Sequence, residues 1–208
     1  IKKLSLLYPG KREQDKIEIK NDIELNIFHI DLKGETREDF EDNCAAFIDF
    51  DNDGDLDLYV GTGINNNRDV KLEKDRFYIN TNNKFIKSDI IPENKLNTST
   101  VIPYDYDQDG DTDLFIGNFS STRKFGDNVT SYLLNNNGQG KFTIDNQLKL
   151  ESKVTSAKWE DINNDGIKDL IVSCHWDNPK LYINNAGKFN LLDLKSNLNG
   201  LGQTISTF

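Results

Sequence analysis

The chain has 208 residues and carries 35 acidic against 25 basic side chains, which gives a formal charge of -10. This acidity argues against a nucleic-acid partner, because phosphate recognition needs a basic face. No apolar run approaches the roughly 20 residues of a membrane-spanning helix, and no signal peptide is visible. Since the sequence begins at Ile1 and contains no methionine, we expect a processed or partial chain.

The cysteine content excludes a disulfide-stapled scaffold. There are only two cysteines, Cys44 and Cys174, and they form no CxxC pair. We expect both to be buried free thiols, the ordinary state of isolated cysteines in strands. A bridge between Cys44 and Cys174 is the alternative.

The first 43 residues differ from the rest of the chain. Segments 16–20 and 24–28 alternate apolar and polar residues like strands, but no acidic loop accompanies them. We expect residues 1–43 to form an N-terminal strand-rich segment or the end of a preceding domain.

A nine-residue acidic loop then occurs three times, beginning at residues 49, 105 and 161, at equal intervals. Short β-type runs precede the three loops, at 45–48, 100–104 and 157–159. Similar runs follow them, at 56–61, 113–117 and 169–173. Because turn residues bound each run, the pairs predict β-hairpins closed by the acidic loop.

A second predicted hairpin follows in each unit, at 77–85, 132–142 and 181–189. Its centre is rich in Asn and Gly, which tolerate the positive φ of tight turns. Four short strands per repeat are typical of a β-propeller blade, so the predicted fold is all-β, a β-propeller. The predicted units are 44–97, 98–153 and 154–198, with a partial fourth at 199–208. Since propellers need several blades to close, we expect part of a ring of about seven blades.

The joint between the two hairpins varies in length. Segments 62–74 and 118–130 are polar insertions, whereas the third unit has little insertion. Insertions on one face of a repeat array are often where partners bind.

The acidic loops predict a calcium site in each unit, about three ions in all. Calcium takes six to eight oxygen ligands, and alternating side chains at positions 1, 3 and 5 of a tight loop can converge on one centre. Glycine at position 6 permits the turn, the backbone carbonyl of position 7 can join, and the aspartate at position 9 closes the sphere. The predicted ligands are Asp49, Asp51, Asp53, Asp55 and Asp57; Asp105, Asp107, Asp109, Asp111 and Asp113; and Asp161, Asn163, Asp165, Ile167 and Asp169.

An EF-hand, a magnesium site and a metal-free turn all fit these loops less well than calcium. An EF-hand begins in the same way but needs Glu at position 12, where this chain has Val60, Ile116 and Val172. Magnesium prefers fewer protein ligands and more waters. A solvated acidic turn without metal is already the less favoured account of one loop, and it is a poor account of three loops at constant spacing.

The loop pattern D-x-[DN]-x-[DN]-G-x-x-D, followed by an apolar strand, resembles the FG-GAP/VCBS repeat over about 44–208. The sequence of residues 50–58, followed later by the patterns Tyr-Leu/Ile-Asn-Asn and Lys-Phe, is similar to the repeats of bacterial VCBS proteins related to the ASPIC/UnbV cartilage acidic protein group. This resemblance implies the calcium-binding propeller of integrin α-subunits and of bacterial surface proteins, located extracellularly, at the cell surface or in the periplasm. The third loop departs from the pattern at Asn163 and Ile167, so we expect it to be the weakest site.

The remaining chemistry-bearing residues favour structural roles. His29 and His175 lack a second ligand at metal spacing, and no Ser/His/Asp set or catalytic Cys/His pair is recognisable. Trp159 precedes the third loop in a strand, which favours core packing. Trp176 lies beyond the following strand and is the better candidate for an exposed contact.

The sequence therefore favours a non-enzymatic, calcium-binding extracellular propeller module that binds a protein or polysaccharide ligand in adhesion. Two alternatives remain open. One is a portion of a carbohydrate-active enzyme resembling polysaccharide lyases, and the other is a structural spacer in a surface protein.

Overall fold

A computed structural model describes residues 42–63, 74–82, 84–121, 126–127, 129–138 and 140–192. The predicted strands at 16–20 and 24–28 and the partial unit at 199–208 lie outside these residues. Within the described part every regular element is a β-strand. No helix in these ranges has the length and apolar character needed to cross a membrane.

The strands form three four-stranded antiparallel sheets, which we call blades 1, 2 and 3. Blade 1 comprises β1 (Asp42–Ile48), β2 (Asp57–Thr62), β3 (Arg76–Asn80) and β4 (Phe85–Ser88). Blade 2 comprises β5 (Leu96–Tyr104), β6 (Asp113–Ser121), β7 (Thr130–Asn136) and β8 (Phe142–Glu151). Blade 3 comprises β9 (Lys153–Glu160), β10 (Asp169–His175), β11 (Lys180–Asn185) and β12 (Lys188–Leu192). Each is a meander of neighbouring strands, so the predicted propeller-blade architecture is confirmed.

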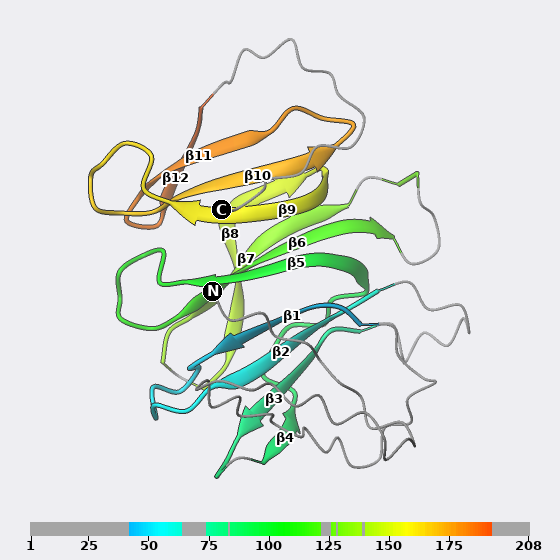
Figure 1. The fold of residues 1–208 in the computed structure, drawn as a ribbon, viewed down its shortest axis with the longest axis vertical. Helices are drawn as coiled ribbons and strands as arrows, with labels where there is room; N and C mark the ends of the chain where they lie inside the picture. Colours follow the sequence, from blue (N-terminus) through cyan, green and yellow to red (C-terminus); the bar gives the residue numbers. More distant parts are fainter. Residues whose placement is uncertain are drawn as a thin grey trace, which may run out of the picture.

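The first strands of the blades, β1, β5 and β9, lie side by side (Figure 1). The core fills the two spaces between neighbouring blades. One cluster contains Phe50 and Phe77 of blade 1 with Leu114 and Ile116 of blade 2. The other contains Phe115 of blade 2 with Leu170 of blade 3. Because the middle blade is covered on both faces, consecutive residues of β6 are buried instead of alternate ones, and Leu114, Phe115 and Ile116 form an apolar run within it.

Glycines allow the blades to approach one another closely. A Cβ built on Gly117 in β6 would lie 2.5 Å from Thr100 Cγ2 and 2.7 Å from Val154 Cγ1 of blade 3. On Gly61 in β2 it would lie 2.9 Å from Thr98 Cγ2 of blade 2. These two glycines therefore set the spacing between blades.

We expect Gly117→Ala to destabilise the protein by about 1–3 kcal/mol, because the added methyl overpacks the joint between blades 2 and 3. Urea unfolding measures this change. Gly126→Ala is the matched control, since nothing lies within 4 Å of its added Cβ. Equal midpoints for the two variants would contradict the role assigned to Gly117.

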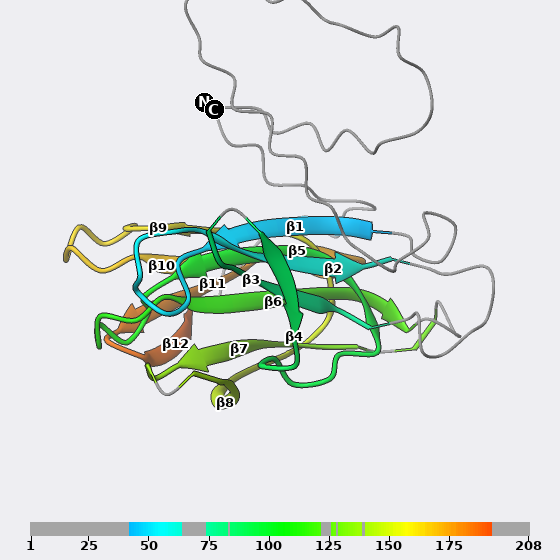
Figure 2. The ribbon, with the colours of Figure 1, turned by 90° about the horizontal axis from the view of Figure 1, so that it is seen from below.

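The connections between strands differ at the two ends of the sheets. The three acidic loops join β1 to β2, β5 to β6 and β9 to β10, and all lie at the same end, on the left of Figures 1 and 2. Because the strands are antiparallel, the joints that follow β2 and β6 leave from the opposite end. The predicted insertions thus begin on the face away from the acidic loops.

A buried polar network joins blades 1 and 2 near this opposite end. The carboxylate of Asp75 accepts hydrogen bonds from Tyr59 Oη at 2.6 Å, Thr98 Oγ1 at 2.7 Å and Asn94 Nδ2 at 2.8 Å. It also accepts the Thr62 N–H at 2.8 Å. Burial raises the pKa of Asp75, and these donors oppose that shift. The network fixes the stem of the first insertion to the neighbouring blade.

The structure confirms that Cys174 is a buried free thiol and that Trp159 lies in the core, but the prediction of full burial is wrong for Cys44. Both cysteines are free; Cys174 is buried and Cys44 half-buried. Trp159 packs in the core, where its Nε1 donates to the Ile102 carbonyl at 3.4 Å. Trp176 is 57% exposed and its ring lies against that of His175, with centroids 4.6 Å apart and the ring planes tilted by 38°.

Candidate metal centres

The three acidic loops share one backbone conformation. The residue at position 4 has a positive φ in each loop, 57° for Asn52, 64° for Gln108 and 60° for Asn164. The glycine at position 6 follows with φ of 89°, 97° and 89° at Gly54, Gly110 and Gly166. The φ near 60° at position 4 lies in the left-handed region that asparagine adopts more readily than most residues, whereas a φ near 90° strains any residue with a Cβ, so position 6 selects glycine. This confirms the turn predicted for that position.

Side chains within each loop hold this turn closed. The carboxylate at position 1 accepts the N–H of the position 6 glycine in all three loops, at 3.2 Å for Asp49, 3.1 Å for Asp105 and 2.9 Å for Asp161. The carboxylate at position 5 accepts the N–H of position 7, at 2.9, 2.9 and 2.8 Å. Each loop is thus organised by its own aspartates.

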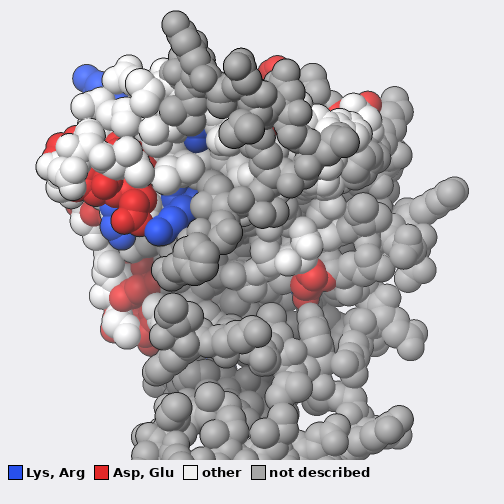
Figure 3. Space-filling view, turned by 45° about the horizontal axis from the view of Figure 1, so that its top comes forward, with Lys and Arg blue, Asp and Glu red and all other residues white. Residues whose placement is uncertain are grey.

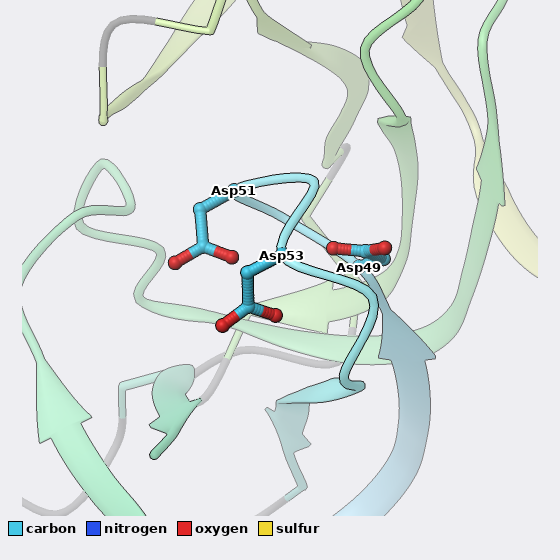
Figure 4. Close-up of side chains that lie close together, drawn as sticks. All are labelled: Asp49, Asp51 and Asp53. Carbon is cyan, nitrogen blue, oxygen red and sulfur yellow. The ribbon is translucent and has the colours of Figure 1, made fainter. Parts of the chain in front are cut away.

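The first three predicted ligands of loops 1 and 2 come together. Asp49, Asp51 and Asp53 each place one carboxylate oxygen within 4.8 Å of the others, and Figure 4 shows these three side chains around the turn. Asp105, Asp107 and Asp109 make the same arrangement in loop 2. A cation between three carboxylates would offset their mutual repulsion.

Two of these carboxylates have a buried oxygen without a protein hydrogen-bond partner. They are Asp49 Oδ1 and Asp105 Oδ1, which occupy the same position in the two loops. A buried, unsatisfied carboxylate oxygen is costly, and a bound cation satisfies it. The donor set consists of oxygen atoms alone, which fits a hard cation such as calcium.

Position 7 is occupied differently in the three loops. The carboxylate of Asp111 accepts a hydrogen bond from Asn52 Nδ2 of loop 1 at 2.6 Å. Desolvation, together with Asp53, Asp51 and Asp49, raises the pKa of Asp55. In loop 3 the residue is Ile167, which offers only its backbone. The predicted role of the three backbone carbonyls as ligands stays a prediction.

The aspartate at position 9 lies apart from the exposed positions. Asp57, Asp113 and Asp169 are at most 1% exposed, and both oxygens of each carboxylate accept backbone N–H groups. One donor is position 2 of the same loop, at 3.0, 3.2 and 3.0 Å. The other is an asparagine on the third strand of the blade, at 2.7, 2.8 and 2.9 Å. Position 9 therefore ties the loop to its own sheet, and metal coordination there stays a prediction.

Burial and crowding raise the pKa of several loop carboxyls. The pKa of Asp113 rises to about 8, because burial outweighs the two N–H donors and because Asp107 and Asp109 lie nearby. The pKa values of Asp57 and Asp107 rise for the same main reason. A cation in the loop favours the ionised carboxylates and so opposes these shifts.

Loop 3 is poorer in negative charge. Position 3 is Asn163, and its Nδ2 donates to the Asp165 carboxylate at 2.8 Å. Position 8 is Lys168, whose Nζ lies 5.3 Å from the centre of the Tyr104 ring in blade 2. These features are consistent with the expectation of a weaker third site.

The structure adds a set of residues that the sequence reasoning missed. Asn80, Asn136 and Asn184 lie at or near the end of the third strand of each blade, and at most 9% of each is exposed. The side-chain amide of each donates to the position 8 carbonyl of its own loop, at 3.2, 3.3 and 3.2 Å. In the sequence Asn80 and Asn184 directly follow an Ile, whereas Asn136 lies two residues after Leu134. This recurrence of Asn in the second hairpin indicates turn formation but not the hydrogen bond to the acidic loop.

The acidic end is also apparent on the molecular surface. In Figure 3, Asp and Glu side chains gather on the left, the side on which the acidic loops lie in Figure 1. A few Lys and Arg side chains lie beside them. This end therefore favours cations over anions.

Three four-stranded blades, each with an acidic loop after its first strand, define a repeat protein of the β-propeller class. A family model described as FG-GAP-like repeat matches residues 49–116 and 105–172, which together span more than half of the chain. Each match begins at an acidic loop and ends in the strand after the next loop. The chain belongs to the FG-GAP-like repeat family.

A search of curated proteins found no match to this chain. The family assignment confirms the FG-GAP part of the predicted resemblance, while the ASPIC/UnbV relationship stays a prediction. FG-GAP repeats commonly bind calcium, are generally non-catalytic and are typical of extracellular domains.

Proposed function

We propose that this chain is a calcium-binding β-propeller module of an extracellular, cell-surface or periplasmic protein. The observation that carries the proposal is the convergence of three carboxylates in loop 1 and again in loop 2, each around a partnerless buried oxygen. Calcium acts on structure here: it neutralises the crowded carboxylates and holds each hairpin loop closed.

Titration calorimetry of the intact chain tests the binding. We expect calcium binding to release or absorb a heat well above that of dilution. Magnesium is expected to bind more weakly, because it prefers more water ligands. The variants Asp53→Ala and Asp109→Ala, at exposed position 5 of loops 1 and 2, are each expected to remove one site. Wild-type heats no larger than buffer dilution would contradict the proposal.

We further propose that the module binds a protein or polysaccharide ligand through the end opposite the acidic loops. The support is topological, since the two longer joints leave blades 1 and 2 at that end, while blade 3 closes its joint within His175–Lys180. A ligand site formed by these joints would vary between family members without disturbing the calcium loops.

Binding assays on immobilised polysaccharides and extracellular-matrix proteins test this second part. A variant in which residues 64–73 are replaced by a Gly-Ser linker is expected to lose binding while keeping its calcium heat. The Leu56→Ser variant, at an exposed site in the acidic loop end, is the matched control. Binding that is lost in the control but kept in the linker variant would place the ligand at the opposite end from the one proposed.

A further inference from the structure

The calcium loops of neighbouring blades are connected by hydrogen bonds through one buried asparagine at each joint. Asn136 Nδ2 of blade 2 donates to the carbonyl of Phe50, position 2 of loop 1, at 2.8 Å. The same amide donates to the Thr112 carbonyl of loop 2 at 3.3 Å. One fully buried side chain thus holds the backbone of two acidic loops.

The joint between blades 2 and 3 repeats this arrangement. Asn184 Nδ2 donates to the Tyr106 carbonyl of loop 2 at 2.9 Å and to the Lys168 carbonyl of loop 3 at 3.2 Å. The amide plane is fixed in both cases, since the Oδ1 atoms of Asn136 and Asn184 accept the N–H groups of Gly138 and Gly187. Two occurrences of the same contact make it a property of the repeat.

Both backbone polar groups of Phe50, at position 2 of loop 1, are hydrogen-bonded, one within blade 1 and the other to blade 2. The N–H of Phe50 donates to Asp57 of its own loop at 3.0 Å, while its carbonyl accepts the amide of Asn136 from the next blade. The ring of Phe50 also packs on Phe142 of blade 2, with centroids 4.9 Å apart. The conformation of loop 1 therefore depends on the position of blade 2.

A second contact joins loops 1 and 2 directly. Asn52 Nδ2 at position 4 of loop 1 donates to the Asp111 carboxylate at position 7 of loop 2, at 2.6 Å. An ion that ordered loop 2 would fix both Asp111 and the Thr112 carbonyl. Through Asn52 and Asn136, this ordering would hold loop 1 in the conformation that gathers its carboxylates.

We propose that Asn136 and Asn184 are positioning residues that couple calcium binding between adjacent blades, so that filling one loop raises the affinity of its neighbour. This inference rests on the calcium binding proposed above. When two sites share their ordering, the first ion has already restricted the backbone of both loops. The protein therefore loses less conformational entropy when the second ion binds, which is positive coupling.

Site-resolved NMR of the intact chain tests the coupling. The amides of Gly54, Gly110 and Gly166 each donate to the position 1 aspartate of one loop, so each reports one site. Asp109→Ala changes an exposed side chain and removes the loop 2 site. We expect it to raise the calcium midpoint at Gly54 by about fivefold or more. Salt at about 0.3 M screens the simple loss of charge.

Variants of the bridging asparagines distinguish coupling through hydrogen bonds from coupling through the charge of the loops. We expect Asn136→Ala to raise the Gly54 and Gly110 midpoints by about threefold to tenfold while leaving Gly166 unchanged. In this background Asp109→Ala should shift the Gly54 midpoint less than it does in the wild type, because only the contact between Asn52 and Asp111 still joins the two loops. Asn80→Ala is the matched control, since among the loop backbones its amide reaches only its own loop, and it should affect Gly54 alone.

The outcomes distinguish the two proposals. Glycine resonances of the wild type that do not respond to calcium would overturn calcium binding itself. Calcium binding with the same Gly54 midpoint in the wild type and in Asp109→Ala would overturn the coupling alone. This comparison decides the matter even if Asn136→Ala does not fold.

Discussion

Removing calcium with EDTA is expected to lower the melting temperature of this protein by about 10 °C or more. Each loop holds up to five carboxylates, and in loops 1 and 2 three of them meet within 4.8 Å. A ligand at about 100 times its dissociation constant stabilises the folded state by about 2.7 kcal/mol per site. For a chain of this size, each kcal/mol shifts the melting temperature by about 2–4 °C.

Differential scanning calorimetry with calcium, with magnesium and with EDTA measures this effect. The variant Asp53→Ala/Asp109→Ala is the control, because it lacks one carboxylate in each of the two richest loops. It should melt close to the EDTA-treated wild type and respond little to calcium. A wild-type melting temperature that is identical in calcium and in EDTA would show that the loops do not stabilise the fold through a metal.

Replacing the position 9 aspartate is expected to destabilise the protein even without calcium. In Asp113→Ala the N–H groups of Tyr106 and Asn136 lose their shared acceptor in a site that is fully buried. Each unsatisfied buried group costs about 1–3 kcal/mol, so for the two N–H groups we expect a loss of roughly 2–6 kcal/mol. Urea unfolding in EDTA measures it.

Asp109→Ala is the matched control for this experiment. It lies in the same loop, and its side chain is exposed and accepts only a local turn hydrogen bond. We expect its unfolding midpoint in EDTA to stay near that of the wild type, because removing one crowded charge compensates for the lost bond. If both variants were equally stable in EDTA, the carboxylate of Asp113 would have no structural role beyond that of a metal ligand.

The repeat can be predicted from the sequence because a blade is a local unit. Hairpins such as β1–β2 depend on nearby residues, namely apolar runs on either side of a loop whose Gly54 requires positive φ. The meander order then follows from short connections between consecutive strands. Periodicity and turn chemistry carry this information within about 40 residues.

The contacts between blades could not be derived in the same way. Asn136 meets the Phe50 carbonyl 86 residues earlier in the chain, and nothing in a single repeat indicates which backbone group its amide reaches. The different roles of the aspartates within one loop could not be predicted either. Alternating aspartates at positions 1 to 9 look equivalent in sequence, whereas burial makes Asp57 a backbone acceptor and leaves Asp51 and Asp53 at the surface.

A crystal structure of the full chain grown with calcium tests the central claim most directly. The claim is that the acidic loops are cation sites that hold the blades. We expect anomalous density between Asp49, Asp51 and Asp53 and between Asp105, Asp107 and Asp109, with carboxylate oxygens at about 2.3–2.6 Å from the ion. Loops that keep the same turn in millimolar calcium but hold only water between these carboxylates would contradict it.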